Sequence, residues 1–128
     1  LTLLDRCDVY LDCPAFSGYT TAWMALHRGL PIVTLEGPAL RQRLAAGLLR
    51  RAGLPAGIAS SADEYVAIAA GLAAGCCDEL HRRELRAAIR AAAPAVDDDL
   101  RVVRSFEECL LRALAARGAG VPPAPGET

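Results

Sequence analysis

The stretch "DVYLDCPAFSGYTTAWMALHRGLPIVTL", residues 8–35, decides the fold of this chain. It opens with a short run of strand formers, "DVYLDC" at 8–13, and closes with a second such run, "PIVTL" at 31–35. Between them "TTAWMALHRG" predicts a helix of about two turns, which ends at Gly29 because glycine commonly terminates helices. A strand, a helix and a strand in such a short segment predict a parallel βαβ unit.

The alternation of strands and helices continues beyond residue 35. Gly37 and Pro38 predict the opening of a second helix. The leucines that we expect to stack along one side of that helix are Leu40, Leu44 and Leu48. "AGIAS", residues 56–60, is a weaker third strand candidate. The fold class is therefore α/β, with a parallel sheet flanked by helices as in half of a Rossmann-like fold.

Three further helices are expected at the C-terminal side. Ser61 and Glu64 form a capping-box pattern at the start of the first, which places Tyr65, Ile68, Ala69 and Leu72 on one face. The second covers residues 78–93 and stops before Pro94. The third begins at the acidic residues 97–99, where the helix dipole favours negative charge. The apolar residues that we expect it to turn inward are Leu100, Val103, Phe106, Leu110 and Leu114.

The chain is long enough for one domain with a substantial core. We expect this domain to cover residues 1–117, followed by a disordered tail at 118–128, "GAGVPPAPGET". The sequence lacks an initiator Met and opens inside an apolar stretch, which indicates a fragment of a longer protein. The use of arginine for every basic residue, with no lysine or asparagine, suggests GC-rich codon usage and a bacterial source.

Composition also limits the classes of partner. The net charge of −1 gives no support for a nucleic-acid or anionic-membrane partner. No signal peptide is visible, and no apolar run approaches the roughly 18 residues of a membrane span. The five cysteines contain no CxxC pair and no histidine lies at metal-ligand spacing, so we expect no metal site and reduced, mostly buried thiols in a cytoplasmic protein.

The turn "FSGYTT", residues 16–21, is the candidate binding site. It follows the first strand, so it lies at the carboxyl edge of the sheet, where ligands of this fold class bind. Gly18 allows the backbone to bend or a ligand to approach closely. Thr20 and Thr21 are expected at the N-cap and first turn of the helix, where free N–H groups, the helix dipole and two hydroxyl groups could hold a diphosphate. The same residues could instead form an ordinary turn and cap without a ligand, and the motif by itself favours this interpretation.

Other candidates are weaker. Asp8 and Asp12 share one face of a strand but lie roughly 13 Å apart, too far to act as a pair, and Asp12 is expected to accept hydrogen bonds in a turn or cap. His27 lies in the last turn of its helix, where a cation is favourable. Arg41 or Arg43 could approach a bound phosphate from the following helix.

The two remaining polar features are expected to face solvent. His81 lies in the strongly charged segment "DELHRREL". The basic run formed by Arg82, Arg83, Arg86 and Arg90 is interrupted by Glu79 and Glu84, which favours a solvated helix face.

Residues 5–114 resemble the C-terminal catalytic half of the O-linked N-acetylglucosamine transferases, a group that includes the plant SPINDLY proteins and their bacterial relatives. The shared elements occur in the same order. They are a strand with D-x-x-L-D, a turn ending in G-x-T-T, a G-x-P-x-V-T strand, a leucine-rich helix with an arginine, a G-L-P turn and an E-Y helix. The order and spacing of six elements make the resemblance far more specific than any one of them.

The resemblance implies a GT-B glycosyltransferase, in which the nucleotide sugar lies between two Rossmann-like halves and this chain is the nucleotide-binding half. In the family a G-H-T-T turn holds the diphosphate of UDP-N-acetylglucosamine, so Gly18, Tyr19, Thr20 and Thr21 become the donor diphosphate site, with Tyr19 in place of His. An Asp one turn later contacts the ribose, and Met24 occupies that position here.

Further implications of the resemblance concern residues around this turn and outside the chain. Arg43 matches the family's arginine and is the candidate on the phosphate side, whereas Pro38 stands where the family usually has an acidic residue. The uracil contacts lie upstream of Leu1 and the catalytic contacts largely in the other half, so the catalytic residues stay unknown.

The resemblance thus implies transfer of N-acetylglucosamine from UDP-N-acetylglucosamine to Ser or Thr hydroxyls of proteins, with no cofactor besides the donor. Its partners would be the N-terminal half of the same protein and an acceptor protein held through upstream helical repeats. Two alternatives remain: a non-catalytic Rossmann-like scaffold that has lost donor recognition, and a transferase that uses another nucleotide sugar. Tyr19 and Met24 are the residues that keep these alternatives open.

Overall fold

The structure is a computed structural model in which residues 2–118 are described. It divides into two compact units, one that ends at Asp97 and one that begins at Asp98. The first unit holds the sheet and the helices around it, and the described part of the second contains one long helix. The predicted tail at 118–128 lies outside the described residues except for Gly118, which still belongs to the long helix.

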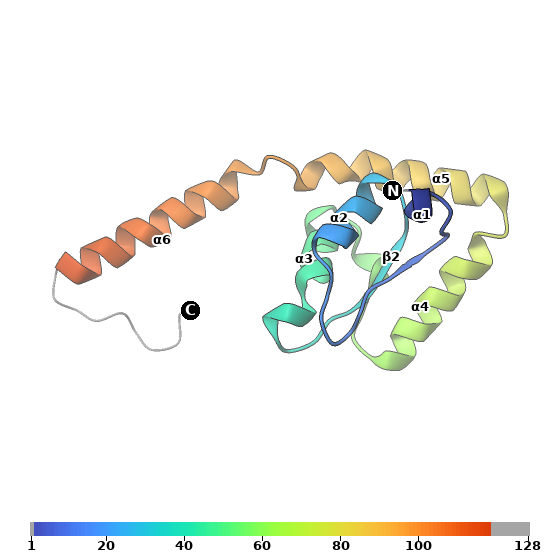
Figure 1. Ribbon diagram of the computed structural model, residues 1–128, viewed down its shortest axis with the longest axis horizontal. Coiled ribbons are helices and arrows are strands. Elements are labelled where there is room, and N and C mark those ends of the chain that lie inside the picture. The colour runs from blue at the N-terminus through green and yellow to red at the C-terminus, as the bar shows by residue number, and fades with distance from the viewer. Residues whose placement is uncertain (1, 119–128) are drawn as a thin grey trace. The chain divides into compact units, whose positions relative to one another are not determined.

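The first unit alternates strands and helices as the sequence predicts (Figure 1). Its strands are β1 (Tyr10–Leu11), β2 (Ile32–Leu35) and β3 (Ile58–Ala59). Its α-helices are α1 (Thr2–Asp5), α2 (Thr20–His27), α3 (Leu44–Arg51), α4 (Ala62–Gly75) and α5 (Glu79–Ala92). Short 3₁₀ turns occur at η1 (Leu40–Gln42), η2 (Pro55–Gly57) and η3 (Ala93–Val96). The second unit contains α6 (Leu100–Gly118).

The three strands form a parallel sheet in the order β1-β2-β3, which confirms the predicted architecture. Tyr10 pairs with Ile32 and Thr34 pairs with Ile58. In Figure 1, α2 and α3 lie together on one side of β2, and α4 lies on the other. The loop after β1 and the segment after β2 both lie at the lower edge in this view, which is therefore the carboxyl edge of the sheet.

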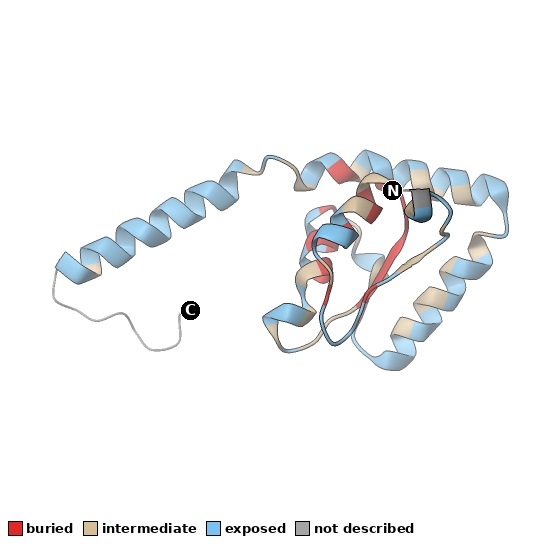
Figure 2. Cartoon of the chain, viewed as in Figure 1, coloured by how far each residue is buried: buried red, intermediate tan, exposed pale blue. Residues whose placement is uncertain are grey.

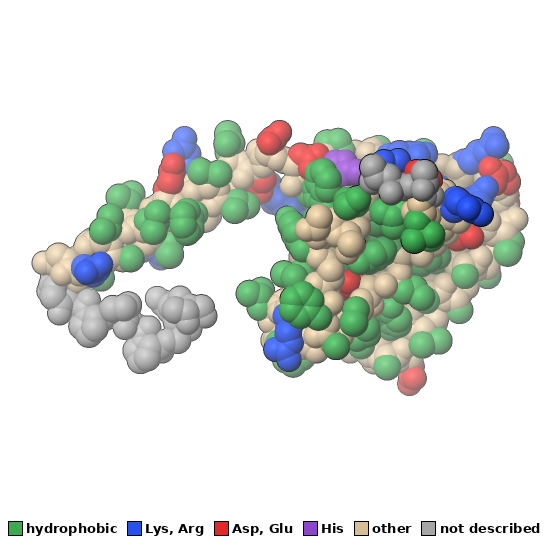
Figure 3. All heavy atoms as spheres, in the orientation of Figure 1, with side chains coloured by type: hydrophobic (Ala, Val, Ile, Leu, Met, Phe, Trp, Pro, Cys, Tyr) green, Lys and Arg blue, Asp and Glu red, His purple; other side chains and the backbone are tan. Residues whose placement is uncertain are grey.

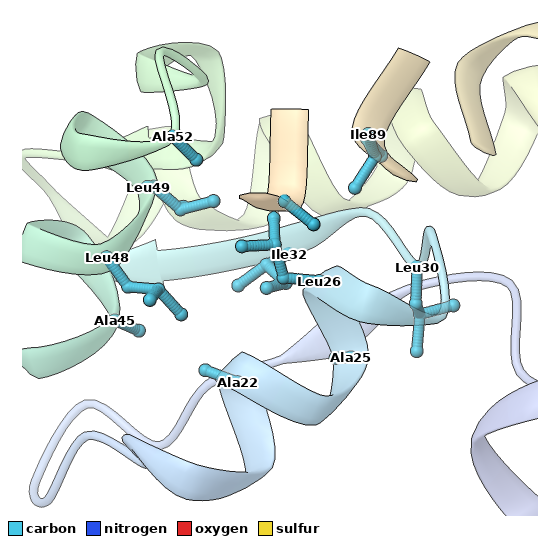
Figure 4. Packing of buried hydrophobic residues seen from close by; sticks show 11 residues of the cluster. Ala22, Ala25, Leu26, Leu30, Ile32, Ala45, Leu48, Leu49, Ala52 and Ile89 are labelled. Atoms are coloured by element: carbon cyan, nitrogen blue, oxygen red, sulfur yellow. The ribbon is translucent and has the colours of Figure 1, made fainter. Parts of the chain in front are cut away.

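The core is built from small and branched aliphatic side chains between β2 and the helices (Figure 4). Leu26 from α2, Leu30 and Ile32 from the β2 region, Leu49 from α3 and Ile89 from α5 meet there, and none is more than 5% exposed. Alanines of α2 and α3 allow these helices to approach each other closely. Figure 2 shows the buried positions concentrated in β2 and on the inner sides of α2 and α3.

Helix α2 ends where the sequence predicts. Gly29 has φ of +69°, a conformation that favours glycine. A Cβ at this position would lie 2.4 Å from the carbonyl oxygen of Arg86 in α5. Gly29 therefore serves both as the helix stop and as the point where α5 packs against the end of α2.

Some helix predictions are wrong in detail. The second helix does not open at Gly37 and Pro38, because the turn η1 comes first, and Leu40 is 78% exposed instead of stacking with Leu48. The capping box is partly right: Ser61 accepts from the Glu64 N–H, but the Glu64 carboxylate accepts from Ser60, one residue earlier than expected.

The predicted inward face of the last helix is also wrong. All five of its apolar residues are at least 48% exposed, because residues 98–118 contain no second element against which to bury them. The thiols are free, as expected, but Cys13, Cys77 and Cys109 are exposed, so "mostly buried" does not hold.

Candidate functional site

The candidate site is the loop that joins β1 to α2, together with the turn η1 that follows β2. The two segments are hydrogen-bonded to each other. The Ser17 backbone N–H donates to the carbonyl oxygen of Arg41 at 2.8 Å, and Gln42 Nε2 donates to the carbonyl oxygen of Pro14 at 3.3 Å. The carboxyl edge of the sheet is thus a joined surface made from two loops that are more than 20 residues apart in sequence.

Asp12 is the residue that fixes this loop. Its side chain is only 2% exposed, and its carboxylate accepts three hydrogen bonds. The donors are Ser17 Oγ at 2.6 Å, the Gly18 N–H at 2.8 Å and Thr34 Oγ1 at 2.7 Å. These partners are neutral, so a buried negative charge is stabilised by hydrogen bonds from hydroxyl and amide groups. The expectation that Asp12 accepts hydrogen bonds in a turn is confirmed.

Ser17 extends this network to the next helix. Its hydroxyl donates to Asp12 and accepts from the Ala45 N–H of α3 at 2.9 Å, so it satisfies an otherwise unpaired N–H in the first turn of that helix. Ser17 and Thr34 are both buried. Sequence reasoning missed both roles, although a threonine inside the buried strand "PIVTL" requires a polar partner and could have signalled the network.

Gly18 lies where no side chain fits. A Cβ there would lie 2.4 Å from Thr21 Oγ1 and 2.7 Å from the Tyr10 hydroxyl. Those two hydroxyl groups are hydrogen-bonded to each other at 2.7 Å. The absence of a side chain at Gly18 is therefore explained by the close packing of the turn onto the Tyr10–Thr21 pair, a reason that the sequence did not predict.

The start of α2 differs from the sequence prediction at one position. Tyr19 is the N-cap residue and Thr20 is the first helical residue, so the helix begins one residue earlier than expected. Among the described residues no side chain caps this helix end. The N–H groups of the first turn of an α-helix lack intrahelical partners, so those of Thr20 and Thr21 point out of the carboxyl edge with the positive end of the helix dipole.

The other candidates around the turn lie as follows. Tyr19 is 53% exposed and Met24 is partly buried, one helical turn after Thr20. Arg43 is exposed and its Nε donates to the carbonyl oxygen of Gly37 at 2.8 Å, at the same carboxyl edge. No hydrogen bond joins Arg43 to the turn within the described part of the chain. The structure thus brings Gly18, Tyr19, Thr20 and Thr21 together and leaves Arg43 on the neighbouring loop.

Tyr65 of α4 supports the loop from the other side. Its hydroxyl donates to the Asp12 carbonyl oxygen at 2.9 Å. Burial raises the pKa of this phenol, and the nearby Asp12 carboxylate raises it further. Tyr65 therefore stays protonated and acts as a donor to the loop that carries the site.

His27 has a more specific role than the predicted helix-end cation. Its Nε2 lies 3.2 Å from Asp97 Oδ1, the same oxygen that accepts a hydrogen bond from the Trp23 indole N–H at 3.1 Å. The two rings lie 4.1 Å apart between centroids. This cluster fastens α2 to the end of the first unit, away from the turn. His81 is exposed, as expected.

Two features are absent from residues 2–118. No group of three or more His, Cys, Asp or Glu side chains there could hold a metal ion. None of the described helices is long and apolar enough to cross a membrane.

Comparison with known proteins shows which family the chain belongs to. The model of "Glycosyl transferase family 41" matches residues 4–107, which include the whole site. The chain belongs to this family. It is 35% identical over 95 residues to the probable UDP-N-acetylglucosamine--peptide N-acetylglucosaminyltransferase SPINDLY of Oryza sativa subsp. japonica, a match that covers 72% of the chain. It is 37% identical over 82 residues, or 64% of the chain, to the UDP-N-acetylglucosamine--peptide N-acetylglucosaminyltransferase of Caenorhabditis elegans.

A solved structure confirms the fold of this family 41 chain. A mutant O-GlcNAc transferase of Thermobaculum terrenum superposes with a TM-score of 0.73 over 87% of the chain, at 33% sequence identity. The chain spans about a fifth of that structure's length, 10% of the rice protein and 7% of the nematode protein. The resemblance to the O-linked N-acetylglucosamine transferases is therefore confirmed, over a small part of each whole enzyme.

Proposed function

We propose that this chain is the nucleotide-sugar-binding half of a protein glycosyltransferase and that the turn Gly18–Thr21 holds the donor diphosphate. The whole protein would transfer N-acetylglucosamine from UDP-N-acetylglucosamine to Ser or Thr hydroxyls. The observation that carries the proposal is the uncapped start of α2 at the carboxyl edge, on a turn that the buried Asp12 fixes. The names of the relatives, both UDP-N-acetylglucosamine--peptide N-acetylglucosaminyltransferases, support the choice of donor and acceptor.

The chemistry follows from charge development. When the glycosidic bond to the donor breaks, the leaving diphosphate gains negative charge. Fixed N–H groups at a helix start stabilise such charge without reorganising during the reaction. The Thr20 and Thr21 N–H groups would serve in this way, and the chain has no lysine to take their place. The proposal requires no cofactor besides the donor.

Tyr10 orients one of the hydroxyl donors. Its hydroxyl lies 2.7 Å from Thr21 Oγ1. When the Tyr10 hydroxyl donates, the Thr21 hydroxyl proton is free to point outward toward a phosphate oxygen. The tyrosine would then act as a positioning residue for the diphosphate.

Exposed apolar side chains next to the turn support the proposal that a second half of the protein covers it. Phe16 is 64% exposed, Tyr19 53% and Leu40 78%, on the two loops that the Ser17–Arg41 hydrogen bond joins. Apolar groups gathered beside a polar site are typical of surfaces that another part of the protein covers. We assign this role to the N-terminal half of the same protein, with the acceptor protein held by repeats further upstream.

Tyr19 and Met24 favour a second candidate function. Met24 cannot form the ribose hydrogen bond that the family's Asp forms, and losing such a bond costs on the order of 1 kcal/mol. The alternative is a scaffold half that keeps the fold and no longer recognises a donor. A nucleotide panel separates the candidates: the donor site predicts binding of UDP or of another nucleoside diphosphate, and the scaffold predicts binding of none.

The experiment is calorimetric titration of UDP into the complete protein. We compare the wild type with Thr20→Ala/Thr21→Ala, and use Thr20→Ser/Thr21→Ser, which keeps both hydroxyl groups, as the matched control. Hydrogen bonds to a charged group are worth about 1.5–3 kcal/mol each, so the alanine variant should lose at least tenfold in affinity. The Thr20 and Thr21 N–H groups remain in both variants, so unchanged affinity of the alanine variant would exclude the two hydroxyl groups from the diphosphate site. Absence of UDP binding to the wild type would refute the site itself.

A further inference from the structure

A second polar pocket lies at the other edge of the sheet. It has a volume of about 370 Å³ and is lined by seven side chains from α1, α5 and the end of α2. These are Asp5, Arg28, Glu79, Arg82, Arg83, Arg86 and Arg90. The sequence predicts only a solvated helix face for the arginines of α5. The structure adds walls from two other elements, and Figure 3 shows basic and acidic side chains gathered over this region.

Three of the arginines have carboxylate partners. Arg28 Nη1 lies 3.1 Å from both carboxylate oxygens of Asp5. Arg82 is paired with Glu79 and with Asp8, and Arg83 Nε lies 2.7 Å from Glu79 Oε1. Two carboxylates thus line the pocket and Asp8 adds a third from its margin.

The other two arginines carry the surplus charge. Arg86 donates to the backbone carbonyl oxygen of Cys7 at 3.3 Å, and Arg90 has no recorded partner within residues 2–118. Neither has a carboxylate partner there, so five guanidinium groups against three carboxylates leave two positive charges. Both arginines lie one helical turn apart on α5, which places their side chains on the same face.

The backbone around these two residues is fixed. A Cβ at Gly29 would lie 2.4 Å from the Arg86 carbonyl oxygen and 2.9 Å from Arg90 Cγ. The end of α2 therefore packs directly onto α5 at both arginines. Such packing holds the start of the Arg90 side chain in place and reduces the entropy that a ligand must overcome.

This pocket is distinct from the diphosphate turn. Helix α2 has eight residues, about 12 Å of helix, with the turn at its start and Arg28 just after its end. In Figure 1 the labels α1 and α5 lie at the upper edge, opposite the loops of the carboxyl edge. One ligand molecule in the diphosphate turn is thus not expected to reach Arg86 and Arg90.

We propose that this pocket binds a small soluble anion with two or more phosphate groups. Guanidinium groups match phosphate oxygens in planar, paired hydrogen bonds. A ligand that also binds Arg82 and Arg83 competes with the Glu79 carboxylate, which favours an anion with more charge than a single carboxylate carries. A diphosphate or polyphosphate provides that charge. Arg86 and Arg90 can bind it without breaking an ion pair with a carboxylate.

The test is calorimetric titration of sodium pyrophosphate into the complete protein at constant ionic strength. It is carried out in a Thr20→Ala/Thr21→Ala background, which removes the two hydroxyl donors of the diphosphate turn, and the N–H groups that remain there contribute equally to every variant compared. Arg86→Gln/Arg90→Gln should weaken binding at least tenfold. The matched control, Arg112→Gln/Arg117→Gln on α6, removes the same charge elsewhere and should change affinity less than twofold. Citrate, a carboxylate anion of similar charge, should bind more weakly than pyrophosphate.

Arg90→Gln alone keeps the test valid if the double variant does not fold, because Arg90 is exposed and makes no hydrogen bond within residues 2–118. It should weaken binding severalfold while thermal unfolding stays unchanged. The proposal is overturned if the unsubstituted pocket shows no pyrophosphate binding, if Arg86→Gln/Arg90→Gln binds as tightly as the background, or if the α6 control loses as much affinity.

Discussion

Replacing Asp12 with alanine should weaken the fold and release the loop that carries the candidate site. The substitution removes the acceptor for Ser17 Oγ, Thr34 Oγ1 and the Gly18 N–H, all of which lie within 2.8 Å of it. Each donor left unpaired costs about 1–3 kcal/mol, and the sum is partly offset because a buried carboxylate no longer has to be desolvated. We expect a net loss of about 3 kcal/mol in the free energy of unfolding.

The conservative change to asparagine should cost less. Its amide oxygen can still accept from the Gly18 N–H, whereas its amide nitrogen replaces the oxygen that accepts from both hydroxyl groups. We expect a loss of about 1–2 kcal/mol for Asp12→Asn. The free energy of unfolding should therefore increase from Asp12→Ala to Asp12→Asn to the wild type.

Two measurements check this prediction. Urea denaturation of the complete protein gives the free energy of unfolding, and amide hydrogen exchange gives the local protection of Gly18. Asp8→Ala is the matched control, because Asp8 is exposed and its one recorded ion pair is with Arg82, worth about 0–1 kcal/mol. The reasoning is refuted if Asp12→Ala destabilises no more than Asp8→Ala, or if Gly18 exchanges equally slowly in both variants.

Two further predictions concern the turn and an exposed ion pair. Gly18→Ala should lower UDP affinity by at least tenfold and the free energy of unfolding by about 1–3 kcal/mol, because its Cβ would lie 2.4 Å from Thr21 Oγ1. The control Gly47→Ala, whose Cβ would have nothing within 4 Å, should change neither quantity. Equal effects of the two substitutions in calorimetry and urea denaturation would contradict this prediction. The hydrogen bond from Arg50 holds the pKa of Glu36 below its usual range, so this pair stabilises the fold above pH about 4.5 and the effect disappears as the pH falls through the lowered pKa. Denaturation of Glu36→Gln should therefore match the wild type at low pH and show a deficit only at higher pH; a deficit that is constant with pH would count against it.

Local signals were sufficient for most of the fold. The βαβ unit around residues 8–35 was predicted because strand formers, a helix stop and short connections all agree. Gly29 was predicted as a helix end, and its φ of +69° confirms the reason. Boundaries were less accurate, because η1 formed where the helix was expected to open. The apolar stripe of α6 predicted burial, but a stripe does not specify what covers it.

The polar network under the site could not be found from local signals. Ser17 and Thr34 reach Asp12 across two strands and a loop, and these contacts exist only after the sheet has formed. The same holds for His27, whose partner Asp97 lies 70 residues away in sequence. Spacing predicted the residues of the proposed diphosphate site, whereas long-range contacts decide which residues hold that turn in place.

The most direct test of the central claim is a crystal structure of the complete protein with UDP. We predict that diphosphate oxygens lie within hydrogen-bonding distance, about 2.7–3.2 Å, of the backbone nitrogen atoms of Thr20 and Thr21. The Thr21 hydroxyl should donate to the same phosphate while it keeps its contact with Tyr10. A diphosphate bound away from the start of α2, or a start of α2 covered by another part of the protein while UDP is bound, would contradict the account.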